Sequence, residues 1–252
     1  MLHGKRITVV VPAFNTSVRV TRVIATLPDF VDRCVVVDDA STDDTPAHLG
    51  ACVDPRVAVV RHAENRGVGG AIATGYLRAL DHGAELVAVM AGDAQMDPSD
   101  LAALAEPVAL GRADYAKGNR LGHPECRRAM PLTRWVGNVA LSAMTRAATG
   151  LDHVGDSQCG YTVVSRRVLE RVDVARMWSR YGYPNHLLGA LAHAGLRVVD
   201  VTVRPVYADE RSGVRLRDAL VTVPRILALV AWARLRARPL MGVAASEGAV
   251  KA

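Results

Sequence analysis

An alternation of short apolar runs with helical patterns constrains the fold of the first half of the chain more than any other feature. β-branched and apolar residues fill four short segments, and each segment ends in polar or glycine-rich sequence. The segments are Ile7–Val11, Cys34–Val37, Val57–Val60 and Leu86–Met90. Buried strands that alternate with helices are typical of a parallel sheet with helices on both faces. Ligands bind at the carboxyl ends of such strands, so we expect a binding site where these four runs end.

The second half is less regular but continues the same α/β pattern. In the first half we expect one helix after each of the four runs. The first covers 18–27, the second begins at Thr45, the third ends at Leu80, and the fourth runs from Pro98 to Leu110. Further strands are expected at 113–118, 160–164 and 197–203, and further helices at 131–149, 166–172 and 184–194. In helix 131–149 we expect Trp135 and Met144 on the apolar side.

No linker-like stretch divides the chain, so the sequence predicts one domain over 5–212. Its nucleotide-binding half is expected at about 5–120 and its acceptor half at about 121–212. A basic amphipathic helix is expected at 213–240, followed by a disordered tail at 241–252.

Composition narrows the class of partner. The chain has 252 residues and a formal net charge of +6, which favours an anionic ligand or surface. Aromatic residues make up only 4%, too few for the stacking platforms of a nucleic-acid protein. The four cysteines are scattered and predict reduced thiols, and the histidines show no zinc-binding spacing. No signal peptide and no apolar run of about 18 residues is evident, so we expect a cytoplasmic protein, soluble or peripheral on the membrane.

The run Leu86–Met90 ends in Ala-Gly-Asp-Ala-Gln-Met-Asp-Pro, which presents Asp93, Gln95 and Asp97. Carboxylate and amide oxygens suit Mg²⁺ or Mn²⁺, and a divalent cation held there can bind a diphosphate. The alternative is an ordinary solvated loop. Asp97 before Pro98 is better explained as a turn or helix-cap residue.

Other polar segments leave two interpretations open. Asp38 and Asp39 fit a turn or cap pair, or acceptors for a base or ribose. The segment 65–70 fits a phosphate-binding loop, or tight turns and close helix packing, and it lacks the Lys-Ser/Thr of a P-loop. Asp156 fits a general base or a hydrogen-bonded turn residue. Several arginines are candidate phosphate ligands or ordinary surface charges, namely Arg120, Arg127, Arg128, Arg211, Arg215 and Arg217.

The segment 216–238 combines apolar residues with arginines around Pro224 and contains Trp232. It fits a helix that packs on the core, and it equally fits a basic amphipathic helix at a lipid interface.

Five motifs in order carry a resemblance to a known family. They are Val-Val-Val-Pro-Ala-Phe-Asn, Val-Val-Asp-Asp-Ala-Ser, Asn-Arg-Gly-Val-Gly-Gly-Ala, Gly-Asp-Ala-Gln-Met-Asp-Pro and Asp-Ser-Gln-Cys-Gly-Tyr. Over about Ile7 to Arg217 the chain resembles family 2 glycosyltransferases of the GT-A fold, whose sheet is Rossmann-like, mostly parallel and flanked by helices. The resemblance is strongest to dolichyl-phosphate mannose synthase and bacterial polyprenyl-phosphate glycosyltransferases.

This resemblance implies an inverting transfer of a hexosyl or N-acetylhexosaminyl group from a UDP- or GDP-sugar to polyprenyl phosphate, with Mg²⁺ or Mn²⁺ on the diphosphate, in cell-envelope glycan synthesis. It implies nucleotide-sugar contacts at Pro12, Ala13, Asn15, Asp38, Asp39, Asn65, Gly67, Gly70, Asp93, Ala94 and Gln95. Within this set Asp39 is expected to face the base, Gly67 and Gly70 to let the backbone approach the nucleotide, and Asp93 and Gln95 to bind metal. Acceptor contacts are implied at Arg120, Gln158, Arg211 and Arg215, and catalytic roles at Asp93 and Asp156.

The chain departs from the family pattern at two positions. Thr16 stands where a glutamate is usual, and Ala91 stands where the metal motif often begins with an aspartate. Metal binding is therefore expected to depend on Asp93, Gln95 and the diphosphate itself. A lipid phosphate is already anionic, so Asp156 would position it, whereas a hydroxyl acceptor would need Asp156 as a base. Transfer to a soluble hydroxyl acceptor, and nucleotide-sugar binding without turnover, are the alternatives.

Overall fold

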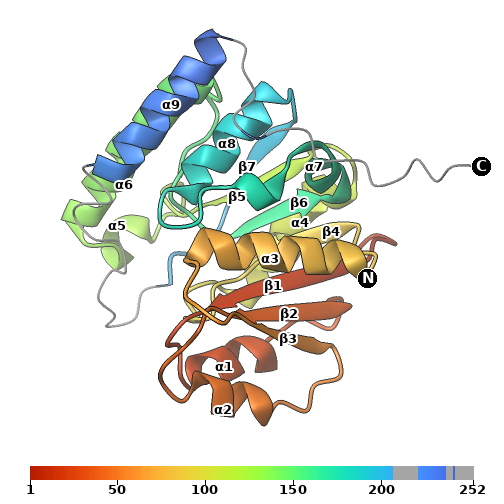
Figure 1. Cartoon of the computed structure of the whole chain (residues 1–252). Helices are drawn as coiled ribbons and strands as arrows, with labels where there is room; N and C mark the ends of the chain where they lie inside the picture. The colour runs from red at the N-terminus through yellow and green to blue at the C-terminus, as the bar shows by residue number, and fades with distance from the viewer. Residues whose placement is uncertain (207–220, 237–240, 242–252) are drawn as a thin grey trace, which may run out of the picture.

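A seven-stranded sheet forms the centre of the computed structural model, which describes residues 1–206, 221–236 and 241 (Figure 1). The strands are β1 (Ile7–Ala13), β2 (Arg33–Asp38), β3 (Val57–Arg61), β4 (Leu86–Val89), β5 (Tyr115–Asn119), β6 (Thr162–Ser165) and β7 (Val198–Thr202). They lie in the order β3-β2-β1-β4-β6-β5-β7. Strand β6 runs antiparallel to its neighbours β4 and β5, and the other paired strands are parallel. The predicted α/β fold with a mostly parallel sheet is confirmed.

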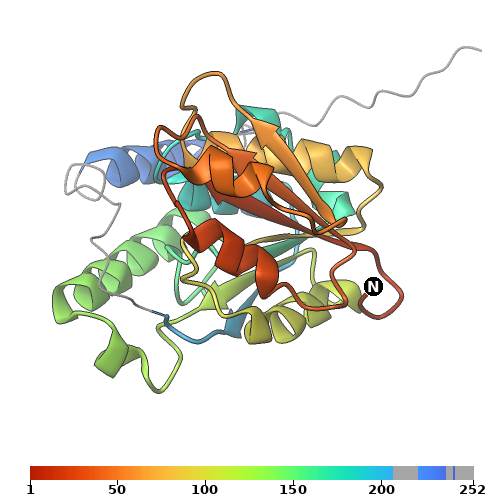
Figure 2. The ribbon, with the colours of Figure 1, turned by 90° about the horizontal axis from the view of Figure 1, so that it is seen from below.

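Helices cover both faces of this sheet. They are α1 (Arg19–Ala25), α2 (Thr45–Gly50), α3 (Val68–Asp81), α4 (Leu101–Ala109), α5 (Cys126–Ala129), α6 (Leu132–Thr149), α7 (Arg166–Arg171), α8 (Tyr183–His193) and α9 (Val223–Leu235), with short 3₁₀ turns η1 (Pro98–Asp100) and η2 (Val174–Arg176). Figure 2 shows α3 on one side of the sheet and α1 and α4 on the other. The elements expected between residues 7 and 203 are present, with ends displaced by a few residues, and α9 covers the central part of the helix expected at 213–240.

Side-chain alternation along β1 explains the two layers. Val9 and Val11 lie in one core with residues of α1 and α4, whereas Val10 lies in a second core with residues of α3 and α8. All three valines are fully buried, as expected for a strand covered on both faces. Helix α3 crosses β1 closely at Gly75, where an added Cβ would lie 2.2 Å from Val10 Cγ1.

The strand order reverses at β1, because β2 and β3 lie on one side of it and β4 on the other. In an open α/β sheet this reversal leaves a crevice at the carboxyl ends of the strands. The segments that leave β1, β2 and β4 therefore converge at one edge of the sheet.

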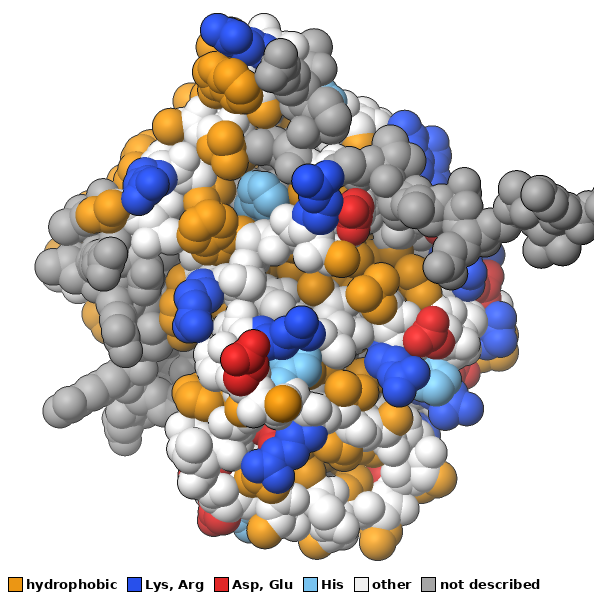
Figure 3. Space-filling view, viewed as in Figure 1, with side chains coloured by type: hydrophobic (Ala, Val, Ile, Leu, Met, Phe, Trp, Pro, Cys, Tyr) orange, Lys and Arg blue, Asp and Glu red, His pale blue; other side chains and the backbone are white. Residues whose placement is uncertain are grey.

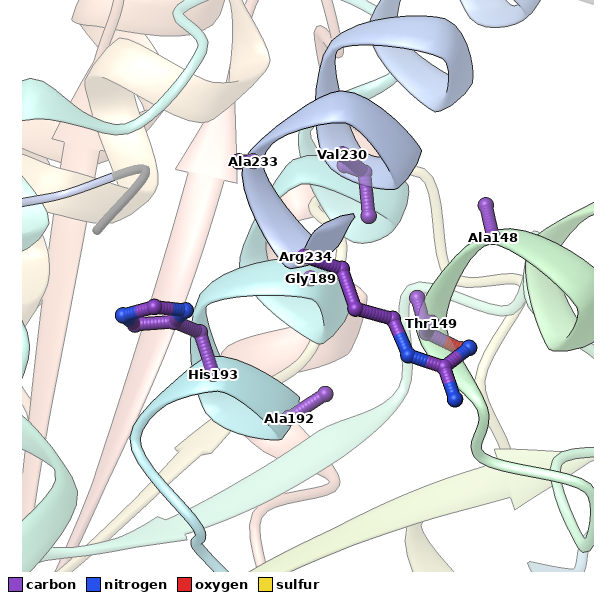
Figure 4. Close-up of a pocket in the computed structure, with 8 residues that line it drawn as sticks. All are labelled: Ala148, Thr149, Gly189, Ala192, His193, Val230, Ala233 and Arg234. Carbon is purple, nitrogen blue, oxygen red and sulfur yellow. The ribbon is translucent and has the colours of Figure 1, made fainter. Parts of the chain in front are cut away.

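Helix α9 packs against α6 and α8 (Figure 1). Its inner residues Val223, Ile226, Leu227 and Val230 are buried with Ala148 of α6. A cavity of about 60 Å³ remains between the three helices, and Arg234 crosses its edge toward α6 (Figure 4). This confirms the core-packing interpretation for the inner face of α9. The flanking parts of the predicted segment, 213–220 and 237–240, and the tail at 242–252 lie outside the described residues.

The orientation of α6 differs from the expectation. Met144, expected on the buried apolar side, is 43% exposed, and Leu132 is 67% exposed. Three of its four buried residues are polar instead, namely Ser142, Thr145 and Thr149. Within the described ranges, no helix combines the length and apolar character needed to cross a bilayer.

Candidate active site

A cavity of about 650 Å³ opens at the strand-order reversal. Six of the residues predicted to contact a nucleotide line it, namely Pro12, Ala13, Asp39, Asn65, Gly67 and Asp93. They come from the ends of β1, β2 and β4 and from the loop before α3. The sequence-based expectation that these segments meet at one edge is therefore met by the structure.

Asp39 organises the loop before α3. Its carboxylate accepts hydrogen bonds from the backbone N–H groups of Arg66 (2.8 Å) and Gly67 (2.7 Å). One oxygen also lies 2.7 Å from Nδ1 of His62, whose other ring nitrogen lies 3.0 Å from the Thr74 hydroxyl. Asp39 is only 2% exposed. The carboxylate expected to face a base is thus engaged by the protein, and its visible role is to hold the loop that lines the cavity.

The glycines of this loop allow a second segment to approach. An added Cβ on Gly69 would lie 2.1 Å from the Trp178 carbonyl oxygen, and one on Gly67 would lie 2.6 Å from the Ser179 carbonyl oxygen. Gly70 donates its N–H to that same Ser179 oxygen at 3.0 Å. Gly67 also adopts φ +84°, which disfavours other residues. Gly67 and Gly70 are expected to let the backbone approach a nucleotide. In the structure the small size of Gly67 and Gly69 admits the 178–180 backbone, and an added Cβ on Gly70 would lie 2.9 Å from the Arg66 Cβ.

The segment 178–181 completes the cavity wall through Trp178, Arg180 and Tyr181. Nothing in the sequence motifs pointed to these residues, although two aromatics flanking an arginine in a loop are a usable signal for a binding site. Among the described residues, the Arg180 guanidinium makes no hydrogen bond or ion pair. An uncompensated cation that lines a cavity favours an anionic ligand.

The loop after β4 places Asp93 on the cavity wall. Asp93 accepts the Gln95 N–H at 3.0 Å, and Ala94 between them has the left-handed φ of +62°. Asp97 accepts the Ser99 N–H at 2.9 Å, which confirms its role as a cap for η1. Across the described part of the chain, no group of three or more His, Cys, Asp or Glu residues could hold a metal ion. A cation here would depend on Asp93 and on oxygens of a ligand.

Asn15 and Asp38 support the edge of the cavity from outside its wall. Asn15 Oδ1 accepts the Thr42 N–H at 2.8 Å, and the Asn15 N–H donates to the Ser41 hydroxyl at 3.0 Å. Asp38 accepts the Ser41 N–H at 2.9 Å and pairs with Arg61 at 3.3 Å. Asn15 thus connects the segments after β1 and β2, whereas Asp38 connects the end of β2 to Arg61 of β3, so the structure gives both a role in shaping this edge.

Asp156 and Arg120 form a buried ion pair. The Arg120 side chain donates Nε to one carboxylate oxygen at 2.8 Å and Nη2 to the other at 3.1 Å. The backbone N–H groups of Gln158 (3.1 Å) and Arg120 (3.3 Å) add two more hydrogen bonds, and the Asp156 side chain is 0% exposed. Burial raises the pKa of Asp156, but the charge and hydrogen bonds of Arg120 outweigh it and leave the pKa below its ordinary value. As placed, this carboxylate is a structural anchor and has no exposed oxygen to act as a base.

Further buried charges lie behind this pair. Lys117 of β5 is fully buried and donates its ammonium to the Cys159 carbonyl, and burial lowers its pKa. Asp200 of β7 accepts hydrogen bonds from Asn119 Nδ2 (2.9 Å) and from the Gly155 N–H (2.6 Å). Burial raises the pKa of Asp200. The loop 155–159 is therefore held from below by charged side chains of β5 and β7.

Helix α6 holds the same loop from the side. Ser142 Oγ accepts the Ser157 N–H at 3.0 Å, and the hydroxyls of Thr145 and Ser157 lie 3.1 Å apart. Gln158 donates to Ser157 Oγ at 2.8 Å and to Asn185 Oδ1 at 3.1 Å. The predicted acceptor residue Gln158 thus belongs to a hydrogen-bonded network between α6 and α8.

The two parts of the site meet at Tyr161, whose hydroxyl donates to the Asp97 carbonyl at 3.1 Å. This bond joins the loop that carries Asp156 to the loop that carries Asp93. Of the predicted acceptor residues, Gln158 belongs to the loop 155–159, and Arg120 binds that loop through Asp156. Arg211 and Arg215 lie outside the described residues.

Comparisons with known proteins agree with this geometry. The family model described as Glycosyl transferase family 2 matches residues 8–173. The chain is 28% identical to UDP-N-acetylglucosamine--dolichyl-phosphate N-acetylglucosaminyltransferase of Methanococcus voltae, over 82% of this chain and 88% of that protein. It is also 28% identical to undecaprenyl-phosphate mannosyltransferase of Micrococcus luteus, over 92% of this chain and 98% of that protein.

A similar solved structure is glucosyl-3-phosphoglycerate synthase of Mycobacterium tuberculosis in complex with Mn²⁺, UDP and glucosyl-3-phosphoglycerate. It aligns with a TM-score of 0.66 and 21% identity, over 91% of this chain and 81% of that one, and it shows the shared fold. The sheet order, the cavity at its edge and the match over 8–173 lead to one conclusion: the chain belongs to glycosyl transferase family 2 and is a glycosyltransferase of the GT-A fold.

Proposed function

We propose that this glycosyltransferase moves a sugar from a UDP- or GDP-sugar to polyprenyl phosphate and inverts the anomeric centre. The observation that carries the proposal is the cavity of about 650 Å³, which is lined both by Asp93 and by Arg180, a cation that pairs with none of the described residues. A volume in this range suits a nucleotide sugar, since ligand cavities span about 300–1,000 Å³. A cation and a carboxylate that line one cavity are the groups that a metal-bound diphosphate requires.

The donor side needs charge neutralisation at the diphosphate leaving group. Arg180 is placed to supply a fixed positive charge there. Asp93, with Gln95 beside it, would hold Mg²⁺ or Mn²⁺, which supplies further neutralisation when bound. One protein carboxylate fits this cation, since Mg²⁺ commonly uses one or two carboxylates together with substrate phosphates. The absence of a carboxylate at Ala91 makes the contribution of Arg180 correspondingly larger.

The names of two relatives support a lipid-phosphate acceptor, one a dolichyl phosphate and the other an undecaprenyl phosphate. A phosphate oxygen is already ionised at neutral pH, so no residue has to remove its proton. The buried Asp156 is consistent with this chemistry because its contribution is to fix Arg120 and the loop 155–159. We propose that Arg120, which keeps 21% of its side chain exposed, lies at the acceptor end of the site. An enzyme that transfers sugar to such a lipid would lie at the cytoplasmic face of a membrane.

The experiment is a transfer assay with purified protein, Mn²⁺ and detergent-dispersed polyprenyl phosphate, each with a panel of UDP- and GDP-sugars. Release of nucleoside diphosphate that requires the lipid phosphate is the expected result. A parallel arm replaces the lipid with soluble alcohols and saccharides. Release that occurs only in this second arm would refute the lipid acceptor while leaving the family assignment intact. Release in neither arm, together with binding of UDP or GDP, would refute turnover itself.

A further inference from the structure

Helix α6 has its polarity reversed relative to an ordinary surface helix. The side chains that face outward are almost entirely apolar and follow helical spacing, namely Leu132, Val136, Val139, Ala140, Ala143, Met144 and Ala147. Leu132 and Val136 are 67% and 52% exposed. A surface helix of a globular protein normally turns such a stripe toward the core. An exposed apolar stripe of this length marks a surface that contacts another protein, a ligand or a membrane.

The inward face of α6 explains why the helix cannot simply rotate. Ser142 and Thr145 are fully buried, and their hydroxyls bind Ser157 beside Asp156. Thr145 also donates to Asn185 of α8 at 2.8 Å. Rotation of the helix would leave these buried polar groups unpaired, which is costly. The outward direction of the apolar stripe is thus fixed by the network that holds the site.

Helix α9, which packs against α6, also exposes apolar residues. Its exposed apolar residues are Leu229, Trp232 and Leu235, the last 86% exposed. Figure 3 shows hydrophobic and basic side chains gathered over α9 at the upper left of the molecule. We define the docking face as the outward residues of α6 given above together with these three residues of α9.

The helices that carry the docking face are basic. The segments 126–149 and 221–236 contain no aspartate or glutamate. Their arginines are Arg127, Arg128, Arg134, Arg146, Arg225, Arg234 and Arg236. Two of them stack on tryptophans at the ends of the helices, with Arg127 5.3 Å from the ring of Trp135 and Arg236 5.1 Å from the ring of Trp232. Tryptophan and arginine beside an apolar stripe are the composition of helices that lie in the lipid headgroup region.

We propose that the docking face lies in the interfacial layer of an anionic membrane, with α6 and α9 parallel to its surface. Charge complementarity selects this occupant, because the arginines match anionic headgroups. A symmetric contact with a second copy of the chain would instead bring arginines against arginines. Sequence patterning had pointed to the C-terminal helix alone, whereas the structure assigns the larger part of this surface to α6.

This placement has one consequence for how the acceptor reaches the site, and that consequence rests on the proposed function. Because α6 binds Ser157 on its inner face and lipid on its outer face, the loop 155–159 lies about one helix diameter, roughly 10 Å, from the headgroups. A lipid phosphate could then reach the site without leaving the membrane surface.

The test is sedimentation of the full-length protein with vesicles of pure phosphatidylcholine and of phosphatidylcholine with phosphatidylglycerol, in the absence of donor and acceptor. We expect binding to the anionic vesicles that weakens as salt is raised, and at least about tenfold weaker binding to the neutral vesicles. Since no substrate is present, the result does not depend on the proposed transfer reaction. Equal binding to both vesicle types, or binding to neither, overturns the proposal.

Val136→Glu places a carboxylate in the centre of the docking face, and Val53→Glu is its matched control. Val53 is 95% exposed and follows α2, which lies at the opposite end of the molecule in Figure 1. Both variants add the same charge, so only the position differs. We expect Val136→Glu to weaken binding to anionic vesicles by about tenfold or more, and Val53→Glu to leave it within about twofold. Equal effects of the two substitutions would show that vesicle binding depends on net charge alone, and would overturn the proposed docking face.

Two further measurements cover the cases in which Val136→Glu unfolds the protein or the docking face binds a second copy of the chain. Leu132→Glu, at a more exposed position on the same face, repeats it if Val136→Glu unfolds the protein, which circular dichroism would show. Light scattering of the free protein detects self-association. A dimer that Val136→Glu dissociates, with no vesicle binding by the wild type, would assign the face to a second copy of the chain and refute the membrane proposal.

Discussion

Replacing Asp156 with asparagine tests whether this residue anchors the site or acts as a base. Its carboxylate receives Nε and Nη2 of Arg120 at 2.8 and 3.1 Å and the Gln158 N–H at 3.1 Å, with no exposure to solvent. Asparagine keeps the size and one acceptor oxygen but removes the charge. The guanidinium of Arg120 would then lose the charge of Asp156 while 79% of its side chain stays covered, given an exposed fraction of 21%.

The expected loss of stability follows from this geometry. Removal of one partner from a buried ion pair costs about 3–5 kcal/mol, because the other charge is left uncompensated. Arg120 keeps some contact with water and asparagine keeps one acceptor, so the lower end applies. We expect Asp156→Asn to reduce the free energy of unfolding by about 3 kcal/mol.

Urea denaturation at pH 7 measures this change directly. The matched variants are Arg120→Gln and the double variant, which complete a thermodynamic cycle for the pair. We expect the double variant to be less destabilised than the sum of the two single variants, with a coupling of about 2 kcal/mol. A loss below about 1 kcal/mol in Asp156→Asn, or additive effects within about 0.5 kcal/mol, would show that the pair does not anchor the fold.

The pH dependence gives an independent check of sign. The folded pKa of Asp156 lies below its ordinary value, so its stabilising contribution is present above the unfolded carboxyl pKa of about 4. It is lost as the pH falls through the folded value. The stability difference between wild type and Asp156→Asn should therefore be constant from about pH 5 to 8 and shrink on acidification. If transfer by the wild type showed an acidic limb that Asp156→Asn abolished, the residue would be a base after all.

Three substitutions test the donor side. Arg180→Gln should raise the KM for the nucleotide sugar by about tenfold or more with little change in Tm, because an exposed cation is removed from the cavity; an unchanged KM would exclude the diphosphate contact. Gly69→Ala should lower Tm and weaken binding of UDP or GDP, since its Cβ would lie 2.1 Å from the Trp178 carbonyl. Asp93→Ala should abolish any Mn²⁺-dependent rise in Tm with UDP or GDP, and retention of that rise would remove the metal from this motif.

The donor half of the site was predictable because its signals are local. The valines before Pro12 require a buried strand, and the polar residues after it must then lie at the sheet edge. The same logic placed Asp39 and Asp93. What it could not show is which atoms these side chains meet, so the role of Asp39 as a holder of backbone N–H groups became clear only in the structure.

The features that could not be predicted from the sequence depend on contacts between residues far apart in the chain. Asp156 and Arg120 are 36 positions apart, and nothing near either residue signals the other. The antiparallel β6 between β4 and β5 likewise depends on pairing between distant segments. Trp178 and Arg180 line the cavity because small residues at Gly67 and Gly69 admit their backbone, which is a property of two segments together.

Helix α6 shows most clearly why periodicity alone is insufficient. Spacing identifies the residues that share a face, including Leu132 and Val136, but it does not say whether that face points inward. The direction is decided by the loop beneath, since the buried Ser157 needs neighbours that donate and accept hydrogen bonds, and Ser142 and Thr145 supply them. A helix that turns its polar side inward for this reason must turn its apolar side outward. The exposed stripe is therefore a physical consequence of how the site is held, and lipid at that surface would stabilise an arrangement that water alone does not favour.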